Sequence, residues 1–209
     1  MESDSDKSNG YEANAEAFIR ARSPEIGVGI VRKWSQSLPR GASVLDLGCG
    51  HGIPVSQVLT ENGFAVYAVD ASATLIAQYR RNFPHAHTEH SAVEHSRFFQ
   101  RKFDGIVACG LIFLLPPESQ VTLIAKSAAA LCSAGRFLFT APEDPVTWID
   151  VLTRRTSVSL GAAKYLEILS THGLTLDGQY ADEGGNHYYS ALNALRPERK
   201  TEHDSATGL

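Results

Sequence analysis

The chain has few basic residues, and this shortage excludes one class of protein. Among its 209 residues, 19 are Lys or Arg and 23 are Asp or Glu, which gives a formal net charge of −4. A protein that binds nucleic acid without regard to sequence needs clustered basic side chains that displace counterions from phosphates. The charge therefore argues against a nucleic-acid partner and favours a small or neutral substrate.

Cysteines and long apolar runs are also scarce. The three cysteines, Cys49, Cys109 and Cys132, show neither metal-ligand spacing nor a disulfide pattern, and the histidines of residues 85–95 follow no usual ligand pattern. No apolar run approaches the roughly 18 residues of a membrane span, and the polar start MESDSDKSNG lacks the apolar core of a signal sequence. We therefore expect a cytoplasmic protein with reduced thiols, no metal and no membrane partner.

The composition changes near both ends of the chain. Residues 1–9 and 196–209 are polar and contain few side chains suited to burial, so we expect both segments to be disordered. Residues 10–195 are long enough for one hydrophobic core and predict a single domain. Its first part, residues 10–38, shows two helical patterns and is interpreted as a helical lid.

Short apolar runs alternate with helical patterns from residue 43 onward. The expected strands are residues 44–47, 66–70, 86–89, 103–109 and 136–140, and the expected helices are residues 53–62, 72–82, 117–133 and 161–172. Such alternation indicates an α/β fold, in which helices cover both faces of a parallel sheet. Two final strand patterns, residues 174–181 and 187–195, flank the turn DEGGN and predict an antiparallel hairpin.

The stretch VLDLGCGHG, residues 44–52, places three glycines at alternate positions directly after a strand. Glycine accepts positive φ and lets the backbone approach a ligand at the carboxyl edge of the sheet, where open α/β folds bind ligands. The spacing departs from the dinucleotide loop G-x-G-x-x-G, whereas Asp70 ends the next strand, where an acid can bond ribose hydroxyls. Together these features indicate a ligand that contains adenosine and disfavour a pyrophosphate.

Four motifs resemble those of the class I S-adenosylmethionine-dependent methyltransferases. VLDLGCGHG is similar to the first motif and AVYAVDAS to the second, and FDGIVACGLIFLLPP and ALCSAGRFLFTAP are similar to the motifs around the fourth and fifth strands. The resemblance covers residues 10–195. It implies a Rossmann-like, doubly wound sheet of seven strands, in the order 3-2-1-4-5-7-6 with strand 7 antiparallel. It also implies S-adenosylmethionine as cofactor and S-adenosylhomocysteine as product.

The resemblance assigns cofactor roles to individual residues. Asp46 is expected to order the amino group of the cofactor, Asp70 to hold the ribose, and Ala71 to pack against the adenine. Either Ser91 or Glu94 is expected to accept a hydrogen bond from the adenine amino group. The complete set of expected cofactor residues is Tyr11, Asp46, Gly48, Cys49, Gly50, Asp70, Ala71, Ser91, Val93, Glu94 and Cys109.

No motif identifies the methyl acceptor. Transfer from a sulfonium requires alignment and exclusion of water, and a base is needed only if the acceptor must lose a proton. The candidates lie near residues 111–113 and 143–148 and at the final hairpin turn. His187 and Tyr188 are the catalytic candidates, although alternation along a strand points them to opposite faces. The candidates for substrate binding are Arg22, Glu143, Trp148 and Asn186.

Two other functions stay open on the sequence. An NAD(P)-dependent oxidoreductase is disfavoured by the missing third glycine of the dinucleotide loop and by the lack of a Tyr-x-x-x-Lys pair. A non-catalytic S-adenosylmethionine-binding sensor would keep the same motifs. The signature of enzymes that methylate the amino groups of bases is missing after the fourth strand, which reads CGLIF. We therefore expect a methyltransferase that acts on a small molecule, as a monomer or a homodimer.

Overall fold

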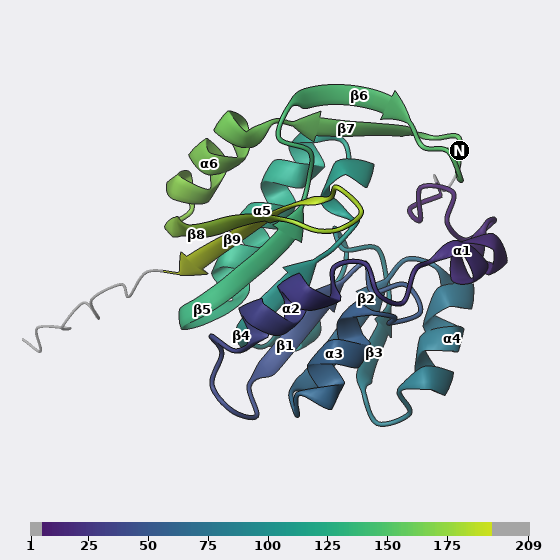
Figure 1. Cartoon of the computed structure of the whole chain (residues 1–209), viewed down its shortest axis with the longest axis horizontal. Coiled ribbons are helices and arrows are strands. Elements are labelled where there is room, and N and C mark those ends of the chain that lie inside the picture. Colours follow the sequence, from purple (N-terminus) through teal and green to yellow (C-terminus); the bar gives the residue numbers. More distant parts are fainter. Residues whose placement is uncertain (1–5, 194–209) are drawn as a thin grey trace, which may run out of the picture.

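The large sheet of the protein has the strand order that the sequence predicts. The computed structural model describes residues 6–193, so the predicted tail of residues 196–209 and residues 1–5 lie outside the described range. Seven strands form one sheet in the order β3-β2-β1-β4-β5-β9-β8, and β6 and β7 form a separate pair (Figure 1). When only the strands of the large sheet are counted, this order is 3-2-1-4-5-7-6, which confirms the prediction.

Five parallel strands form most of the large sheet, and a hairpin completes it. The parallel strands are β1 (Ser43–Leu47), β2 (Ala65–Asp70), β3 (His87–His90), β4 (Phe103–Ala108) and β5 (Leu131–Thr140). The last two strands, β8 (Leu174–Ala181) and β9 (His187–Asn193), are antiparallel to each other, and β9 is antiparallel to β5. The predicted late hairpin is therefore confirmed.

Helices pack on both faces of the large sheet (Figure 1). On one face, α2 (Val28–Ser35) and α3 (Val55–Glu61) form a core with strand residues such as Val44 and Leu138. On the other face, α5 (Pro117–Ala130) and α6 (Ala162–Thr171) pack against strand residues such as Ile106 and Phe139. α4 (Ala73–Asn82) contacts β2 and β3 at the edge of the sheet. None of the helices within residues 6–193 is long and apolar enough to cross a membrane.

The strand pair β6 (Pro145–Ile149) and β7 (Thr156–Leu160) was not predicted from the sequence. β6 is mostly exposed and shows no clear alternation of apolar and polar residues, which is the signal that identifies a strand. The hairpin lies above the large sheet and extends toward the N-terminal segment (Figure 1).

The N-terminal segment also differs from the expectation. The first of the two helical patterns in residues 10–38 gives only a short helix, since α1 comprises Ala15–Ala21. The disorder predicted for residues 1–9 is wrong for residues 6–9, because the Asp6 carboxylate accepts hydrogen bonds from the backbone N–H groups of Ser8 (3.0 Å) and Gly10 (2.8 Å). The polar composition of the segment predicted disorder. The structure instead shows that hydrogen bonds to the Asp6 carboxylate order residues 6–9.

The sheet core predicts a large difference in stability between two isoleucine variants. Ile106 in β4 is fully buried, whereas Ile149 at the end of β6 is 54% exposed. Ile106→Ala should lower the free energy of unfolding by about 2–5 kcal/mol, because it leaves a cavity in a packed core. Ile149→Ala should change it by less than about 0.5 kcal/mol. Urea denaturation followed by circular dichroism measures both values, and equal losses would contradict this assignment of the core.

Candidate cofactor and acceptor cavity

The glycine loop between β1 and α3 folds back against the end of β2. Gly48, Gly50 and Gly52 have φ values of 65°, 56° and 88°, a region that favours glycine. The N–H groups of Gly48 and Cys49 both donate to the carbonyl oxygen of Val69, at 2.8 and 3.2 Å. A Cβ atom at Gly52 would lie 2.3 Å from a ring carbon of Phe83, so the loop also requires glycine there for packing.

Asp70, at the end of β2, holds this loop in place. One carboxylate oxygen accepts a hydrogen bond from the Gly50 N–H at 2.8 Å, and the other accepts one from the Ser72 N–H at 2.8 Å. Burial nevertheless raises the pKa of the Asp70 carboxyl, since only 9% of the residue is exposed. The acid thus joins the glycine loop to the start of α4 and lies at the carboxyl edge of the sheet.

Asp46 is a second buried acid, one strand away in β1. Its carboxylate accepts a hydrogen bond from the Ser56 hydroxyl at 2.6 Å, and that hydroxyl oxygen accepts one from the Tyr79 hydroxyl at 2.8 Å. Burial, together with the charge of Asp70 and opposed in part by the Ser56 hydrogen bond and the charge of Arg22, raises the pKa of Asp46 to about 7. Asp46 therefore changes its ionisation near neutral pH.

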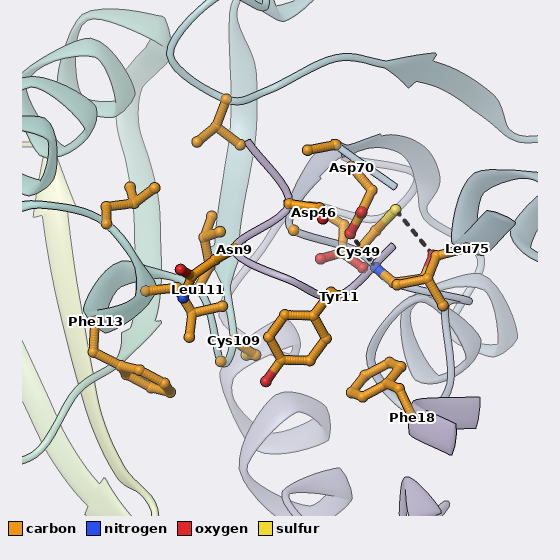
Figure 2. A pocket seen from close by; sticks show the side chains of 18 of the residues that line it. Asn9, Tyr11, Phe18, Asp46, Cys49, Asp70, Leu75, Cys109, Leu111 and Phe113 are labelled. Atoms are coloured by element: carbon orange, nitrogen blue, oxygen red, sulfur yellow. Dashed lines mark hydrogen bonds between the residues drawn. The ribbon is translucent and has the colours of Figure 1, made fainter. Parts of the chain in front are cut away.

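A cavity of about 370 Å³ lies over the glycine loop and the two acids. Figure 2 shows Tyr11 at its centre, with Asp46 and Asp70 near the loop and Leu111 and Phe113 farther away. Most of the expected cofactor residues line this cavity, as do three of the four expected substrate residues. The lining residues that the sequence predicted are Tyr11, Asp46, Gly48, Cys49, Gly50, Asp70, Ala71, Val93, Glu94, Cys109, Arg22, Trp148 and Asn186.

Two other predicted residues lie outside the cavity lining. The hydroxyl of Ser91 donates to the neighbouring carbonyl of Ala92 at 3.1 Å, so of the two candidates for adenine recognition only Glu94 reaches the cavity. Glu143 lies away from the lining, and one of its carboxylate oxygens is 3.5 Å from Nδ1 of His187. Ser91, one of the two alternatives for adenine recognition, and Glu143, a candidate for substrate binding, therefore do not line this cavity.

The two predicted catalytic residues also lie elsewhere. The His187 ring packs edge-on against Tyr189, with ring centroids 4.7 Å apart. Tyr188 points to the opposite face of the sheet, is 4% exposed, and donates its hydroxyl to Asp182 at 2.9 Å. The expected alternation is confirmed, but neither side chain lines the cavity, so we do not place His187 or Tyr188 in the candidate site.

Several lining residues were missed by the sequence analysis. Lys7, Ser8 and Asn9 belong to the segment that was expected to be disordered, and Asp150 follows the unpredicted strand β6. Phe18 shares a helical face with Tyr11, and this periodicity was the one signal available for it. The other missed residues include Val55 in α3 and Leu75 in α4, whose approach to the cavity depends on tertiary packing.

Residues 6–14 lie over the cavity and are called the roof. The roof contacts the surrounding structure at three places. The Glu12 carboxylate accepts hydrogen bonds from the Ser72 hydroxyl and from the N–H and hydroxyl of Thr74, at the start of α4. Lys7 lies 3.6 Å from Glu94, and the Tyr11 hydroxyl lies 3.5 Å from Asp150. The roof is thereby attached to α4, to the loop after β3 and to the β6–β7 hairpin.

Two cysteine thiols lie in the lining but are poor nucleophiles. Burial raises the pKa of Cys109 to about 12, and burial raises the pKa of Cys49 well above its usual value. Both thiols are therefore protonated at neutral pH. Within residues 6–193, no group of three or more His, Cys, Asp or Glu side chains is arranged to hold a metal ion.

The cavity wall also contains polar atoms that the rest of the described chain leaves unsatisfied. One carboxylate oxygen of Glu94 and the side-chain nitrogen of Asn9 are buried without a hydrogen-bond partner among residues 6–193. Buried polar groups are normally paired, so unpaired ones in a cavity indicate where a ligand would bond. With Asp46 and Asp70, they fit a ligand that carries hydroxyl, amino and ammonium groups.

Comparison with known proteins agrees with this geometry. Residues 44–135 match the family of methyltransferase domains. A tRNA U34 carboxymethyltransferase of Nautilia profundicola is 28% identical over 114 residues, which is 51% of this chain and 37% of that protein. The chain thus spans little more than a third of that relative's length.

Solved structures resemble the fold over most of the chain. A 1,6-didemethyltoxoflavin-N1-methyltransferase from Burkholderia thailandensis, with bound 1,6-didemethyltoxoflavin and S-adenosylhomocysteine, superposes with a TM-score of 0.68. It is 18% identical, and the match covers 88% of this chain and 84% of that one. A TehB-like S-adenosylmethionine-dependent methyltransferase from Corynebacterium glutamicum superposes with a TM-score of 0.66 and is 21% identical. The match covers 90% of this chain and 98% of that one.

The matched domain contains the glycine loop, both buried acids and the strands that carry them. The fold, with its seven-stranded sheet, resembles that of the solved methyltransferases over most of the chain. Residues 44–135 therefore match a methyltransferase domain, and the described chain has the Rossmann-like fold of the solved S-adenosylmethionine-dependent methyltransferases.

Proposed function

We propose that the protein methylates a small molecule, which binds beside the cofactor in the roofed cavity. The observation that carries this proposal is the division of the cavity into two chemically different ends. Buried acids and the glycine loop form one end, and aromatic and aliphatic side chains, with Phe113 and Trp148 among them, form the other. The first end suits a polar adenosine derivative and the second an apolar or planar acceptor.

The residues of the polar end would hold S-adenosylmethionine. Asp70 would accept hydrogen bonds from the ribose hydroxyls, Asp46 would attract the ammonium group, and Glu94 would accept from the adenine amino group. Arg22 reaches the same end, since its charge acts on Asp46, and we assign it to the cofactor carboxylate. When bound, this cofactor supplies a methyl group on a sulfonium that is already an activated leaving group.

The contribution of the protein is alignment and exclusion of water. The roof of residues 6–14 covers part of the cavity through Glu12 and Tyr11, so both ends belong to one partly covered space. The buried thiols are protonated, which leaves direct transfer to the acceptor rather than a thiolate intermediate.

Several observations favour a small molecule over RNA. The roof contacts three walls, the cavity measures about 370 Å³, and the formal net charge of the chain is −4. The relative that modifies tRNA matches over only 37% of its own length. The solved Burkholderia enzyme, in contrast, contains bound 1,6-didemethyltoxoflavin, and its fold matches 88% of the residues of this chain.

Two measurements test the proposed function together. Calorimetry should show binding of S-adenosylhomocysteine and no binding of NAD, because the loop lacks the dinucleotide spacing. A screen of small-molecule acceptors with S-adenosylmethionine should then release S-adenosylhomocysteine. Binding of NAD alone would refute the proposal, and tight cofactor binding without turnover on any acceptor would favour a sensor.

Asp70→Asn should weaken cofactor binding. The variant loses the charge that strengthens hydrogen bonds to the ribose hydroxyls and to the Gly50 N–H, so the Kd for S-adenosylhomocysteine should rise about tenfold or more. Asp104→Asn is the matched control. Its carboxylate also accepts hydrogen bonds from a backbone N–H and a hydroxyl, both of Ser43, but at the opposite end of β1. Equal calorimetric Kd values in both variants would contradict the assignment.

Cofactor binding should depend on pH through Asp46. The ionised carboxylate attracts the ammonium group, and its pKa is raised to about 7. Affinity for S-adenosylhomocysteine should therefore fall as the pH decreases, by about tenfold between pH 8 and pH 6, as the ionised fraction decreases. Asp46→Asn should bind weakly and without this pH dependence. A wild-type Kd that is constant across this range would be inconsistent with the role of Asp46.

Glu12→Ala should loosen the roof. The variant removes the carboxylate that accepts three hydrogen bonds at the start of α4, so S-adenosylhomocysteine should dissociate faster and its Kd should rise about threefold to tenfold. Glu16→Ala, which removes an exposed acid of α1, should leave the Kd unchanged. Stopped-flow fluorescence measures the dissociation rate, and identical rates in the two variants would exclude a roof held by Glu12.

A further inference from the structure

Asp150 is the one lining carboxylate, among the residues that the structure describes, that stands apart from the expected cofactor groups. Asp46, Asp70 and Glu94 belong to the polar end of the cavity. Asp150 directly follows β6 and lies two residues after Trp148. Since side chains two positions apart on a strand share a face, Trp148 and Asp150 can both line the cavity, whereas Ile149 between them is exposed.

The hydrogen bonds of Asp150 fix one of its oxygens and leave the other available. Oδ1 accepts hydrogen bonds from the backbone N–H groups of Leu152 at 2.9 Å and Thr153 at 2.7 Å. These bonds orient the carboxylate within the turn that joins β6 to β7. Oδ2 has only the Tyr11 hydroxyl nearby, at the long distance of 3.5 Å, and no ion pair to Asp150 occurs within residues 6–193.

Tyr11 provides a second polar group beside this oxygen. Burial and the neighbouring Asp150 charge raise the pKa of Tyr11 to about 12, so its hydroxyl stays protonated at neutral pH. Figure 2 shows the Tyr11 ring directed into the cavity, between the glycine loop and Phe113. A ligand at this point would meet a fixed carboxylate oxygen and a phenol hydroxyl together.

The wall next to Asp150 is aromatic. The rings of Phe113 and Trp148 lie with their centroids 5.3 Å apart and their planes inclined by 46°. Phe113 comes from the 3₁₀ turn η2 (Ile112–Leu114), which packs against β7. The two rings form one aromatic surface, against which a planar ligand could pack. Asp150 lies two residues after Trp148, so its carboxylate is beside this surface.

We propose that Asp150 determines acceptor specificity by selecting a planar aromatic acceptor that carries an N–H or O–H group at its edge. The ring lies against Phe113 and Trp148, and the N–H or O–H donates to Oδ2 of Asp150. This inference rests on the proposed function, because it assigns the acceptor to the end of the cavity opposite Asp70.

The carboxylate restricts the chemistry of the acceptor. An ionised carboxylate only accepts hydrogen bonds, so it favours a donor and disfavours a ligand that presents its own carboxylate or phosphate there. An analogue without the donor would leave the Asp150 oxygen without a hydrogen bond on binding. Because an unpaired buried polar group is costly, the site should bind such an analogue much more weakly. An acceptor without a planar ring would lose the contacts with Phe113 and Trp148.

Paired probes test this inference by binding alone. Protein saturated with S-adenosylhomocysteine is titrated calorimetrically with benzimidazole and 1-methylbenzimidazole, and separately with 2-naphthol and 2-methoxynaphthalene. The members of each pair differ in the N–H or O–H donor. In at least one pair the donor-bearing compound should bind about tenfold more tightly, as expected for a hydrogen bond to a charged group.

Asp150→Asn should abolish this preference. Its side-chain oxygen can still accept from Leu152 and Thr153, which preserves the turn, but an amide N–H₂ group replaces the free acceptor. The ratio of the two Kd values should then fall to within twofold. Asp144→Asn is the matched control: Asp144 is an exposed acid between β5 and β6 that does not line the cavity, so this variant should keep the wild-type ratio of Kd values.

The outcomes separate this inference from the proposed function. If S-adenosylhomocysteine does not bind the wild-type protein, the proposed function fails first. If it binds with the same Kd in wild type and Asp150→Asn, but neither pair of probes shows a preference for the donor in the wild type, the inference about Asp150 is wrong. A preference that survives in Asp150→Asn, or no binding of any probe, would overturn it equally.

Discussion

The two hydrogen bonds of the Asp70 carboxylate connect most of the parts that build the cavity. Through Gly50 this acid fixes the glycine loop, and through Ser72 it fixes the start of α4. The Ser72 hydroxyl accepts from the Leu75 N–H, which caps α4, and donates to the Glu12 carboxylate. A continuous series of hydrogen bonds therefore runs from the loop at the sheet edge to the roof, so the attachment of the roof depends on the same acid that fixes the glycine loop.

The proximity of two buried acids explains why the polar end favours a cationic, hydroxylated ligand. Asp46 and Asp70 lie on adjacent parallel strands, and burial raises the pKa of each carboxyl. Ionised groups in such a position are costly unless hydrogen bonds or opposite charges compensate for the lost water. Ser56, Gly50 and Ser72 compensate in part. A ligand that brings an ammonium group and hydroxyl donors would complete the compensation.

The sequence predicts the cofactor end well because local chemistry determines it. Three glycines in left-handed conformations, an acid at the end of β2 and strict alternation of strands and helices leave few alternative folds. The acceptor end lacks such local constraints. Trp148 was predicted as a lining residue, but its neighbour Asp150 was missed, and His187 was expected in the cavity although its strand directs the ring toward Tyr189. Residue type alone identified polar candidates there but not their orientation.

The position of the acceptor wall depends instead on contacts between distant segments. The side-chain nitrogen of Gln120 in α5 donates to the carbonyls of Leu115 and of Val158 in β7, and its side-chain oxygen accepts from the Tyr165 hydroxyl in α6. Gln120 is fully buried, so this bridge attaches the β6–β7 hairpin to the helical layer. Because the hairpin is a separate sheet, its lining residues can change without altering the strands that carry Asp46 and Asp70. The proposed cofactor binding and acceptor choice would thereby fall to different parts of one fold.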